Sequence, residues 1–131
     1  MKKFSIIVPA FNEEDVIEKF LEHLQRVLSK SADTYEIIVV DEGSNDKTFS
    51  IASNILDIKV IRHPYNKGNG AAVKTGIHES KGEQLVIIDA DGQHDPQNIL
   101  EMLRLLDEYD LVVGARGSFG LGKRGFGNVV V

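Results

Sequence analysis

The chain has 131 residues, a length that accommodates one domain with one hydrophobic core. Hydrophobic residues make up 42% and charged residues 27%, as in ordinary globular proteins, which excludes disorder, collagen and coiled coil as descriptions of the whole chain. The formal charge of −5 excludes a broad basic surface for nucleic acid, and the absence of cysteine excludes disulfides, thiolate metal sites and a cysteine nucleophile.

The two ends of the chain bear on its location. The apolar stretch before Pro9 is too short for the core of a signal peptide, and no segment approaches the roughly 20 apolar residues of a membrane span. We therefore expect a soluble, cytoplasmic chain. The last three residues form an apolar triplet without a cap or turn, which we interpret as a truncated C-terminus. Missing downstream segments would then hold the protein at the cytoplasmic face of a membrane.

Short apolar runs alternate with stretches of helical period from the first residues onward, a pattern typical of a mainly parallel sheet. The first predicted strand covers residues 5–8 and is stopped by Pro9. Asn12 is then expected to cap a helix whose first turn is acidic. Its expected inner face follows three- and four-residue steps and consists of Val16, Ile17, Phe20, Leu21, Leu24, Val27 and Leu28.

The middle of the chain repeats this alternation twice. Residues 36–40 form a continuous apolar run, typical of a strand buried on both faces. Asp46 is expected to cap a short helix that turns Phe49, Ala52 and Leu56 inward. A third strand at residues 58–62 is followed by a helix over residues 70–80, whose inner face is expected to hold Ala72, Val73, Gly76, Ile77 and Ser80.

The last part of the chain completes the pattern. A fourth strand is predicted at residues 84–88 and a fifth at residues 111–114. Between them, Asp95 as the N-cap and Pro96 as the first helical residue predict a helix with Ile99, Leu100, Leu103 and Leu106 inward. These elements predict a single three-layer α/β/α domain with a mainly parallel, Rossmann-like sheet over residues 1–131.

Acidic loops follow several predicted strands, at the edge where open parallel sheets bind ligands. Asp89 and Asp91 are alternate residues just beyond the fourth strand, so their carboxylates can reach one small volume. Such a cluster is costly unless a cation occupies it, and oxygen ligands favour Mg²⁺ or Mn²⁺. The carbonyl oxygen of Gln93 could add a ligand, whereas His94 is better explained by the start of a helix.

Five segments in order carry a resemblance to a known family. They are IVPAFNE at 7–13, VVDEGSND at 39–46, NKGNGAA at 66–72, DADGQHDP at 89–96 and VGAR at 113–116. Together they resemble the family 2 glycosyltransferases of GT-A fold, most of all the dolichyl- and polyprenyl-phosphate mannosyl- and glucosyltransferases. The resemblance covers nearly the whole chain and implies an inverting hexose transfer from a nucleotide-diphosphate sugar of the GDP-mannose or UDP-glucose type.

The resemblance also assigns site residues. It implies nucleotide-sugar contacts from both ends of the sequence, with Phe11 against the base and Glu42 at a position where the family usually has aspartate. It implies that Asp89, Asp91 and Gln93 hold the metal, and that Asp91 and Arg116 are catalytic. The full set of implied nucleotide-sugar contacts is Pro9, Phe11, Glu13, Val40, Glu42, Asp89, Ala90 and Asp91.

The implied acceptor is a polyprenyl or dolichyl phosphate at a membrane surface. A lipid monophosphate is already anionic, so it needs positioning rather than a general base, and Arg116 offers a bidentate fork for phosphate. Arg124 is a weaker candidate for the same phosphate. The acceptor-binding part of such a protein would lie after residue 131, and the sequence indicates no oligomeric state.

Other interpretations remain open beside this one. Glu13, Glu14 and Asp15 could be ordinary first-turn acids, and residues 41–46 could be a polar turn. Glu42 and the abrupt end also fit a non-catalytic or degenerate nucleotide-sugar-binding module. A nucleotidyltransferase would need a Gly-rich basic loop after the first strand, where this chain has residues 9–13, and residues 68–75 match neither a phosphate loop nor a dinucleotide fingerprint.

Overall fold

The computed structural model describes residues 3–90 and 96–114, with the side chains of residues 96–99 excepted. Five strands form one sheet in which every pair of neighbours is parallel, in the order β3-β2-β1-β4-β5. The strands are β1 (Phe4–Ala10), β2 (Tyr35–Asp41), β3 (Ile58–Arg62), β4 (Gln84–Ile88) and β5 (Leu111–Gly114). The helices are α1 (Ile17–Leu28), α2 (Thr48–Ser53), α3 (Asn69–Glu79) and α4 (Pro96–Leu105).

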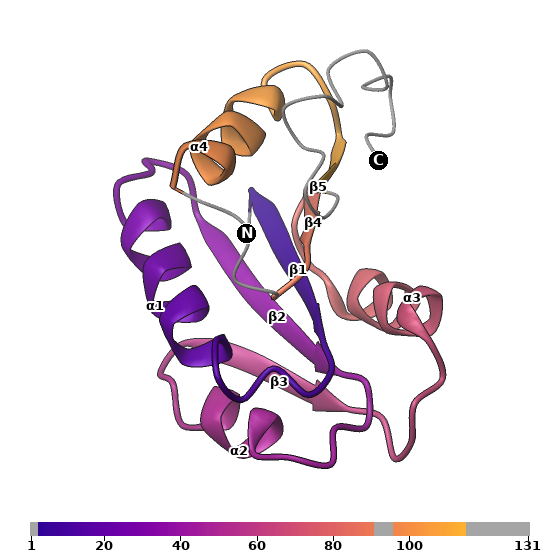
Figure 1. The fold of residues 1–131 in the computed structure, drawn as a ribbon. Helices are drawn as coiled ribbons and strands as arrows, with labels where there is room; N and C mark the ends of the chain where they lie inside the picture. The colour runs from indigo at the N-terminus through magenta and orange to yellow at the C-terminus, as the bar shows by residue number, and fades with distance from the viewer. Residues whose placement is uncertain (1–2, 91–95, 115–131) are drawn as a thin grey trace.

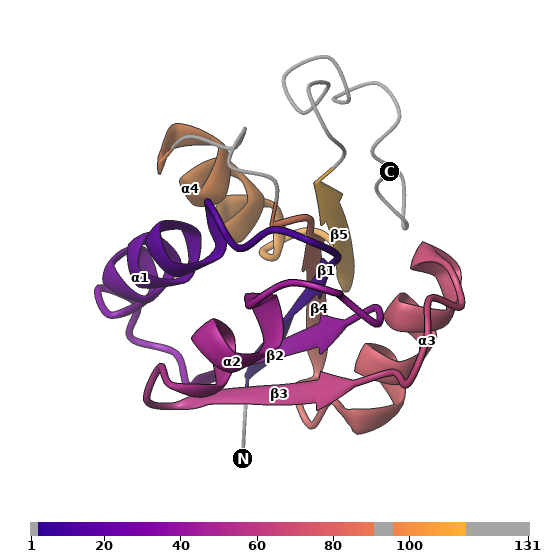
Figure 2. The same ribbon diagram turned by 60° about the horizontal axis from the view of Figure 1, so that its bottom comes forward.

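Helices cover both faces of the sheet, which confirms the predicted three-layer α/β/α fold. Figures 1 and 2 show α1, α2 and α4 on one face and α3 on the other. The larger core lies under the first three helices and includes Leu21, Val39 and Met102, while a smaller cluster under α3 joins Ile38, Val40 and Ala72. Among the described residues no helix is long and apolar enough to cross a membrane.

The strand order reverses between β1 and β4. From β1 the chain moves outward through β2 to β3, and then returns to the other side of β1 to add β4 and β5. Loops that leave β1 and β4 therefore run to opposite faces and leave a crevice between the carboxyl ends of these strands. This edge of the sheet, called the carboxyl edge below, is where the fold leaves room for a ligand.

Pro9 does not stop the first strand, contrary to the sequence prediction. The strand continues to Ala10, and Pro9 stands opposite Val40 of β2. On its other side the pairing with β4 ends at Ile7 and Ile87, two residues earlier. Because β1 has only one neighbour at this point, a residue without an N–H is tolerated there.

The prediction that Asn12 caps α1 is also wrong. The helix begins at Ile17, and Asn12 has a positive φ of 51° in the loop before it. Its side-chain oxygen accepts a hydrogen bond from the N–H of Asn45 at 2.9 Å, so it is used across the chain and not at its own helix. The inner face of α1 is as expected, since Ile17, Phe20, Leu21, Leu24 and Leu28 are buried.

Three apolar side chains expected to face inward are exposed instead. Leu56 is 83% exposed because α2 ends at Ser53, before the chain reaches it, and Ile77 and Leu100 are 40% and 38% exposed. On α4 the buried position is taken by Met102, which the sequence analysis did not select. Asp46 does accept the Thr48 N–H at the start of α2, as a cap would, although the residue directly before the helix is Lys47.

Candidate active site

A cavity of about 180 Å³ lies at the carboxyl edge of the sheet. It is formed where β1, β2 and β4 end and α3 begins. Six of the eight expected nucleotide-sugar contacts line it, together with one residue that the sequence analysis did not select, Asn69. The complete lining is Pro9, Phe11, Glu13, Glu42, Asn69, Asp89 and Ala90.

The other expected site residues do not line this cavity. Val40 is fully buried in the small core under α3, so its side chain faces away from solvent. Asp91, Gln93, His94, Arg116 and Arg124 lie outside the described residues. Their expected roles therefore stay predictions.

Glu42 is the most electrostatically perturbed side chain in the cavity. It is only 7% exposed, and burial raises the pKa of its carboxyl above the ordinary value. The negative charges of Asp89 and Asp41 raise this pKa further, while a hydrogen bond with the side chain of Asn69 opposes the rise. A donor or a cation entering the cavity would relieve this concentration of carboxylates.

The described residues hold only part of the expected metal site. No group of three or more His, Asp or Glu side chains among them is arranged to hold a metal ion. Asp89 does line the cavity beside Glu42, and the mutual repulsion of these two carboxylates fits a site that gains stability from a divalent cation. The donor chemistry present is therefore compatible with Mg²⁺ or Mn²⁺.

A buried ion pair lies behind the cavity. Asp41 is fully buried at the end of β2, and its carboxylate lies 3.4 Å from Nε of Arg62 on β3. Arg62 also donates to the carbonyl of Ser44 at 3.2 Å and lies 4.8 Å from the ring centre of Phe49. This arrangement fixes the start of the loop that carries Glu42.

Gly43 permits a close approach of two loops at the same edge. Its φ is +86°, and a Cβ there would lie 2.6 Å from the carbonyl carbon of Tyr65 and 2.8 Å from the nitrogen of Asn66. No side chain fits this space without moving main chain. Glycine at this position therefore lets the loop after β3 pack against the residue next to Glu42.

Asn69 was missed because its role depends on a distant partner. It is the first residue of α3, and its side chain is hydrogen-bonded to Glu42, which precedes it by 27 positions. The only local signal is a polar residue between Gly68 and Gly70. Gly68 has a φ of 95°, so the main chain turns sharply just before the helix that presents Asn69.

The histidines and lysines considered in the sequence do not join the cavity. Lys67 and Lys74 are exposed, as expected for solvated cations. His63 is buried, and its Nε2 lies 2.9 Å from the hydroxyl of Thr75 on α3. Its position fits a role in packing α3 against the sheet.

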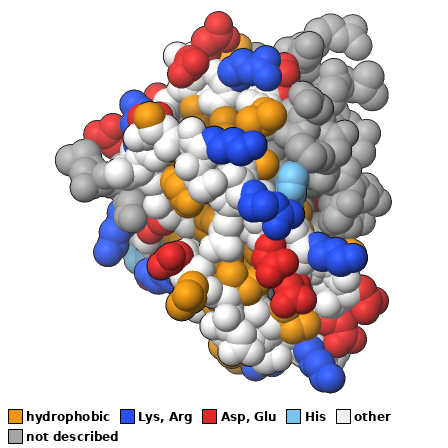
Figure 3. All heavy atoms as spheres, turned by 90° about the vertical axis from the view of Figure 1, so that its left-hand side faces the viewer, with side chains coloured by type: hydrophobic (Ala, Val, Ile, Leu, Met, Phe, Trp, Pro, Cys, Tyr) orange, Lys and Arg blue, Asp and Glu red, His pale blue; other side chains and the backbone are white. Residues whose placement is uncertain are grey.

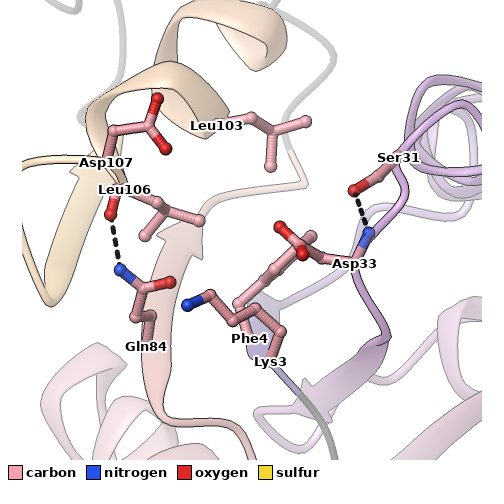
Figure 4. A pocket seen from close by; sticks show the side chains of 8 residues that line it. All are labelled: Lys3, Phe4, Ser31, Asp33, Gln84, Leu103, Leu106 and Asp107. Atoms are coloured by element: carbon pink, nitrogen blue, oxygen red, sulfur yellow. Dashed lines mark hydrogen bonds between the residues drawn. The ribbon is translucent and has the colours of Figure 1, made fainter.

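A second cavity, of about 250 Å³, lies at the opposite edge of the sheet, where the strands begin. Figure 4 shows its lining, which includes Lys3, Asp33 and Asp107. The amide of Gln84 donates to the carbonyls of Leu106 and Tyr109 and is used within the fold. The nearby molecular surface in Figure 3 mixes basic, acidic and apolar side chains without one dominant charge.

Comparison with known proteins establishes the family. Residues 5–129 match the sequence profile of Glycosyl transferase family 2. With this match over nearly its whole length, the chain belongs to glycosyl transferase family 2. The five-stranded parallel sheet with helices on both faces is the GT-A glycosyltransferase fold, as expected from the sequence.

Individual relatives narrow the similarity. The chain is 34% identical to the dolichol-phosphate mannosyltransferase of Pyrococcus furiosus over 118 residues, which cover 87% of this chain and 33% of that protein. It is 36% identical to the human dolichyl-phosphate beta-glucosyltransferase over 102 residues, covering 70% of this chain and 32% of that protein. The chain thus spans about a third of the length of these relatives.

A solved structure gives the same fold with ligands. The glucosyl-3-phosphoglycerate synthase of Mycobacterium tuberculosis, crystallised with Mn²⁺ and UDP-glucose, superposes with a TM-score of 0.65 at 26% identity. The superposition covers 80% of this chain and 39% of that one.

Proposed function

We propose that this chain is the nucleotide-sugar-binding part of an inverting glycosyltransferase. It would take a hexose from a donor of the GDP-mannose or UDP-glucose type and serve an acceptor that is a polyprenyl or dolichyl phosphate. The observation that carries the proposal is the cavity at the carboxyl edge, which gathers Phe11, Glu13, Glu42 and Asp89 from three separate loops. The relatives named for dolichyl-phosphate transfer support the choice of acceptor.

The residues of the cavity divide the work of holding the donor. Phe11 offers an aromatic face to the base, and the Glu42 carboxylate can accept hydrogen bonds from the base edge. Asp89, with Asp91 and Gln93, would hold Mg²⁺ or Mn²⁺. That cation supplies neutralisation of the negative charge that develops on the leaving diphosphate.

The acceptor side of the reaction follows from charge. A lipid phosphate is an anionic nucleophile, so the protein has to orient it and needs no general base. Arg116 is proposed to bind this phosphate, with Arg124 as a weaker candidate, and Asp91 and Arg116 would then be the catalytic residues. The enzyme would act in the cytoplasm, on a membrane surface reached through parts of the protein beyond this chain.

Titration calorimetry with UDP-glucose and GDP-mannose, each with and without Mn²⁺, tests the proposal. One donor is expected to bind in a metal-dependent way, and Asp89→Asn should weaken that binding by about tenfold or more. Asp107→Asn, which removes a carboxylate at the opposite edge of the sheet, is the matched control and should leave binding unchanged. Absence of binding for both donors would contradict the proposal.

A non-catalytic nucleotide-sugar-binding module is the second candidate, favoured by Glu42 where the family usually has aspartate. It predicts donor binding without turnover even in a longer protein that includes the downstream sequence. Transfer of radiolabelled hexose to a polyprenyl phosphate by that longer protein would exclude it.

A further inference from the structure

Two loops at the carboxyl edge are joined by an unusual set of hydrogen bonds. Residues 11–14, called the pocket loop below, carry Phe11 and Glu13 into the cavity. Residues 44–48, called the anchor loop, follow the end of β2. Three consecutive main-chain N–H groups of the pocket loop donate to three side chains of the anchor loop: Asn12 to Ser44 Oγ at 2.9 Å, Glu13 to Thr48 Oγ1 at 2.8 Å and Glu14 to Asp46 Oδ2 at 3.3 Å.

Contacts also run in the opposite direction. The N–H of Asn45 donates to Oδ1 of Asn12 at 2.9 Å, and the N–H of Lys47 donates to Oε1 of Glu14 at 3.3 Å. Asn12 itself has a φ of 51°, in the left-handed region that costs an ordinary residue free energy. The bonds to the anchor loop hold the pocket loop in this conformation.

The two hydroxyl groups of the anchor loop are each oriented by a carboxylate. Ser44 donates its hydroxyl hydrogen to the buried carboxylate of Asp41, and Thr48 donates its own to Asp46. A hydroxyl has one hydrogen to donate, so in both residues the lone pairs remain for the main-chain N–H of the pocket loop. The direction of these bonds is therefore set from within the fold and not by solvent.

We propose that Ser44 and Thr48 are positioning residues of this site, fixing the pocket loop so that Phe11 and Glu13 face the nucleotide-sugar cavity. The inference rests on the proposed function for the identity of the ligand. The mechanism is mechanical: each hydroxyl holds one main-chain N–H, and between them they clamp the residues on both sides of the left-handed turn at Asn12. Loss of either bond would allow the whole pocket loop to move.

The chain contains a matched control for Ser44 at the opposite edge of the sheet. Ser5 is fully buried, donates its hydroxyl to the Glu36 carboxylate at 2.6 Å and accepts the Gly82 N–H at 2.8 Å. Ser44 has the same combination of a carboxylate acceptor and a main-chain donor. Replacing either serine by alanine removes the same chemistry, but only Ser44 contacts the pocket loop.

The experiment compares Ser44→Ala, Thr48→Val, Thr48→Ser and Ser5→Ala in the complete 131-residue chain. Main-chain hydrogen exchange, followed by NMR, reports on the N–H groups of Asn12, Glu13 and Glu14. Calorimetry gives the Kd for UDP-glucose and GDP-mannose with Mn²⁺. All variants are measured at a temperature where unfolding experiments show them to be folded.

In Ser44→Ala and Thr48→Val, exchange at all three N–H groups is expected to rise together by about tenfold, and donor affinity to fall by a similar factor. Thr48→Ser keeps the hydroxyl and should stay within about twofold of the parent chain in both measurements. Ser5→Ala should lose as much stability as Ser44→Ala without changing either measurement at the carboxyl edge.

Two outcomes would overturn the inference. The first is unchanged exchange in the pocket loop of Ser44→Ala and Thr48→Val. The second is an equal change in Ser5→Ala, which would mean that stability alone controls the loop. If the parent chain binds neither donor, the proposed function fails, and hydrogen exchange still decides whether these hydroxyls position the loop.

Discussion

The two edges of the sheet use the same chemistry for different ends. At the amino edge, where the strands begin, Ser5 joins Glu36 to the N–H of Gly82 and ties three neighbouring segments into the sheet. At the carboxyl edge, Ser44 joins Asp41 to the N–H of Asn12 and fixes a loop that lines a cavity. The difference lies in what the held segment does next, since one leads into a strand and the other presents side chains to a ligand.

Glycines at the two edges provide the largest expected effect. A Cβ at Gly43 would lie 2.6 Å from the main chain of Tyr65, and one at Gly82 would lie 2.5 Å from the main chain of Phe4. Each Gly→Ala change should therefore cost roughly 2–4 kcal/mol of unfolding free energy, measured by urea denaturation. Only Gly43→Ala is expected to weaken nucleotide-sugar binding at temperatures where both variants are folded, and an equal loss in Gly82→Ala would remove the distinction between the edges.

The carboxylates behind the two serines are expected to rank next. Asp41 is fully buried and paired with Arg62, so Asp41→Asn should cost about 2 kcal/mol, less than a fully buried pair because the arginine is half exposed. Glu36 is partly exposed, so Glu36→Gln should cost under about 1 kcal/mol. Thermal unfolding measures both, and a larger loss for Glu36→Gln would contradict the ranking.

Acid should release the anchor loop before the rest of the carboxyl edge. Desolvation acts to raise the pKa of Asp46, but hydrogen bonds from the hydroxyl and N–H of Thr48 and from the N–H of Glu14 outweigh it and hold the pKa below its ordinary value. A carboxyl with a lowered folded-state pKa stabilises the fold above its unfolded-state pKa and loses that contribution as the pH falls through the folded value.

Asp46→Asn is therefore expected to cost at most about 1 kcal/mol at pH 7, since the carboxylate is partly exposed. The difference from the parent chain should stay constant down to about pH 4 and shrink toward zero near pH 2. Urea denaturation across this range measures it. A difference that does not change with pH would show that the charge of Asp46 is not what holds the loop.

The same comparison explains how far the sequence could predict this molecule. The bounds of β3, β4 and β5 match their apolar runs, because polar or turn-forming residues flank each run. Six cavity residues were also selected in advance through the resemblance to a family, although their role in binding stays a prediction. Local pattern and ordered motifs were sufficient for these features.

What the sequence could not predict depends on contacts between distant residues. Asn12 has a suitable side chain for a helix cap, yet it accepts its hydrogen bond from Asn45, 33 residues away. Asn69, Ser44 and Thr48 have no local signal beyond being polar, and their roles exist only after the strand order brings their loops together. Leu56 was expected inside because periodicity does not indicate where a helix stops.

The smallest expected effect is a gain in stability at the cavity itself. Glu42 is buried beside Asp89, and burial together with this neighbouring charge raises the pKa of its carboxyl, so the ionised form is unfavourable in the folded protein. Glu42→Gln removes the charge and keeps a side chain that can bond to Asn69, so unfolding at pH 7 should occur about 2 °C higher or less. Donor affinity should fall in the same variant because the base edge loses a charged acceptor. Differential scanning calorimetry with and without donor measures both, and a stability loss in the free protein would mean that the Glu42 carboxylate serves the fold as Ser5 does and not the ligand.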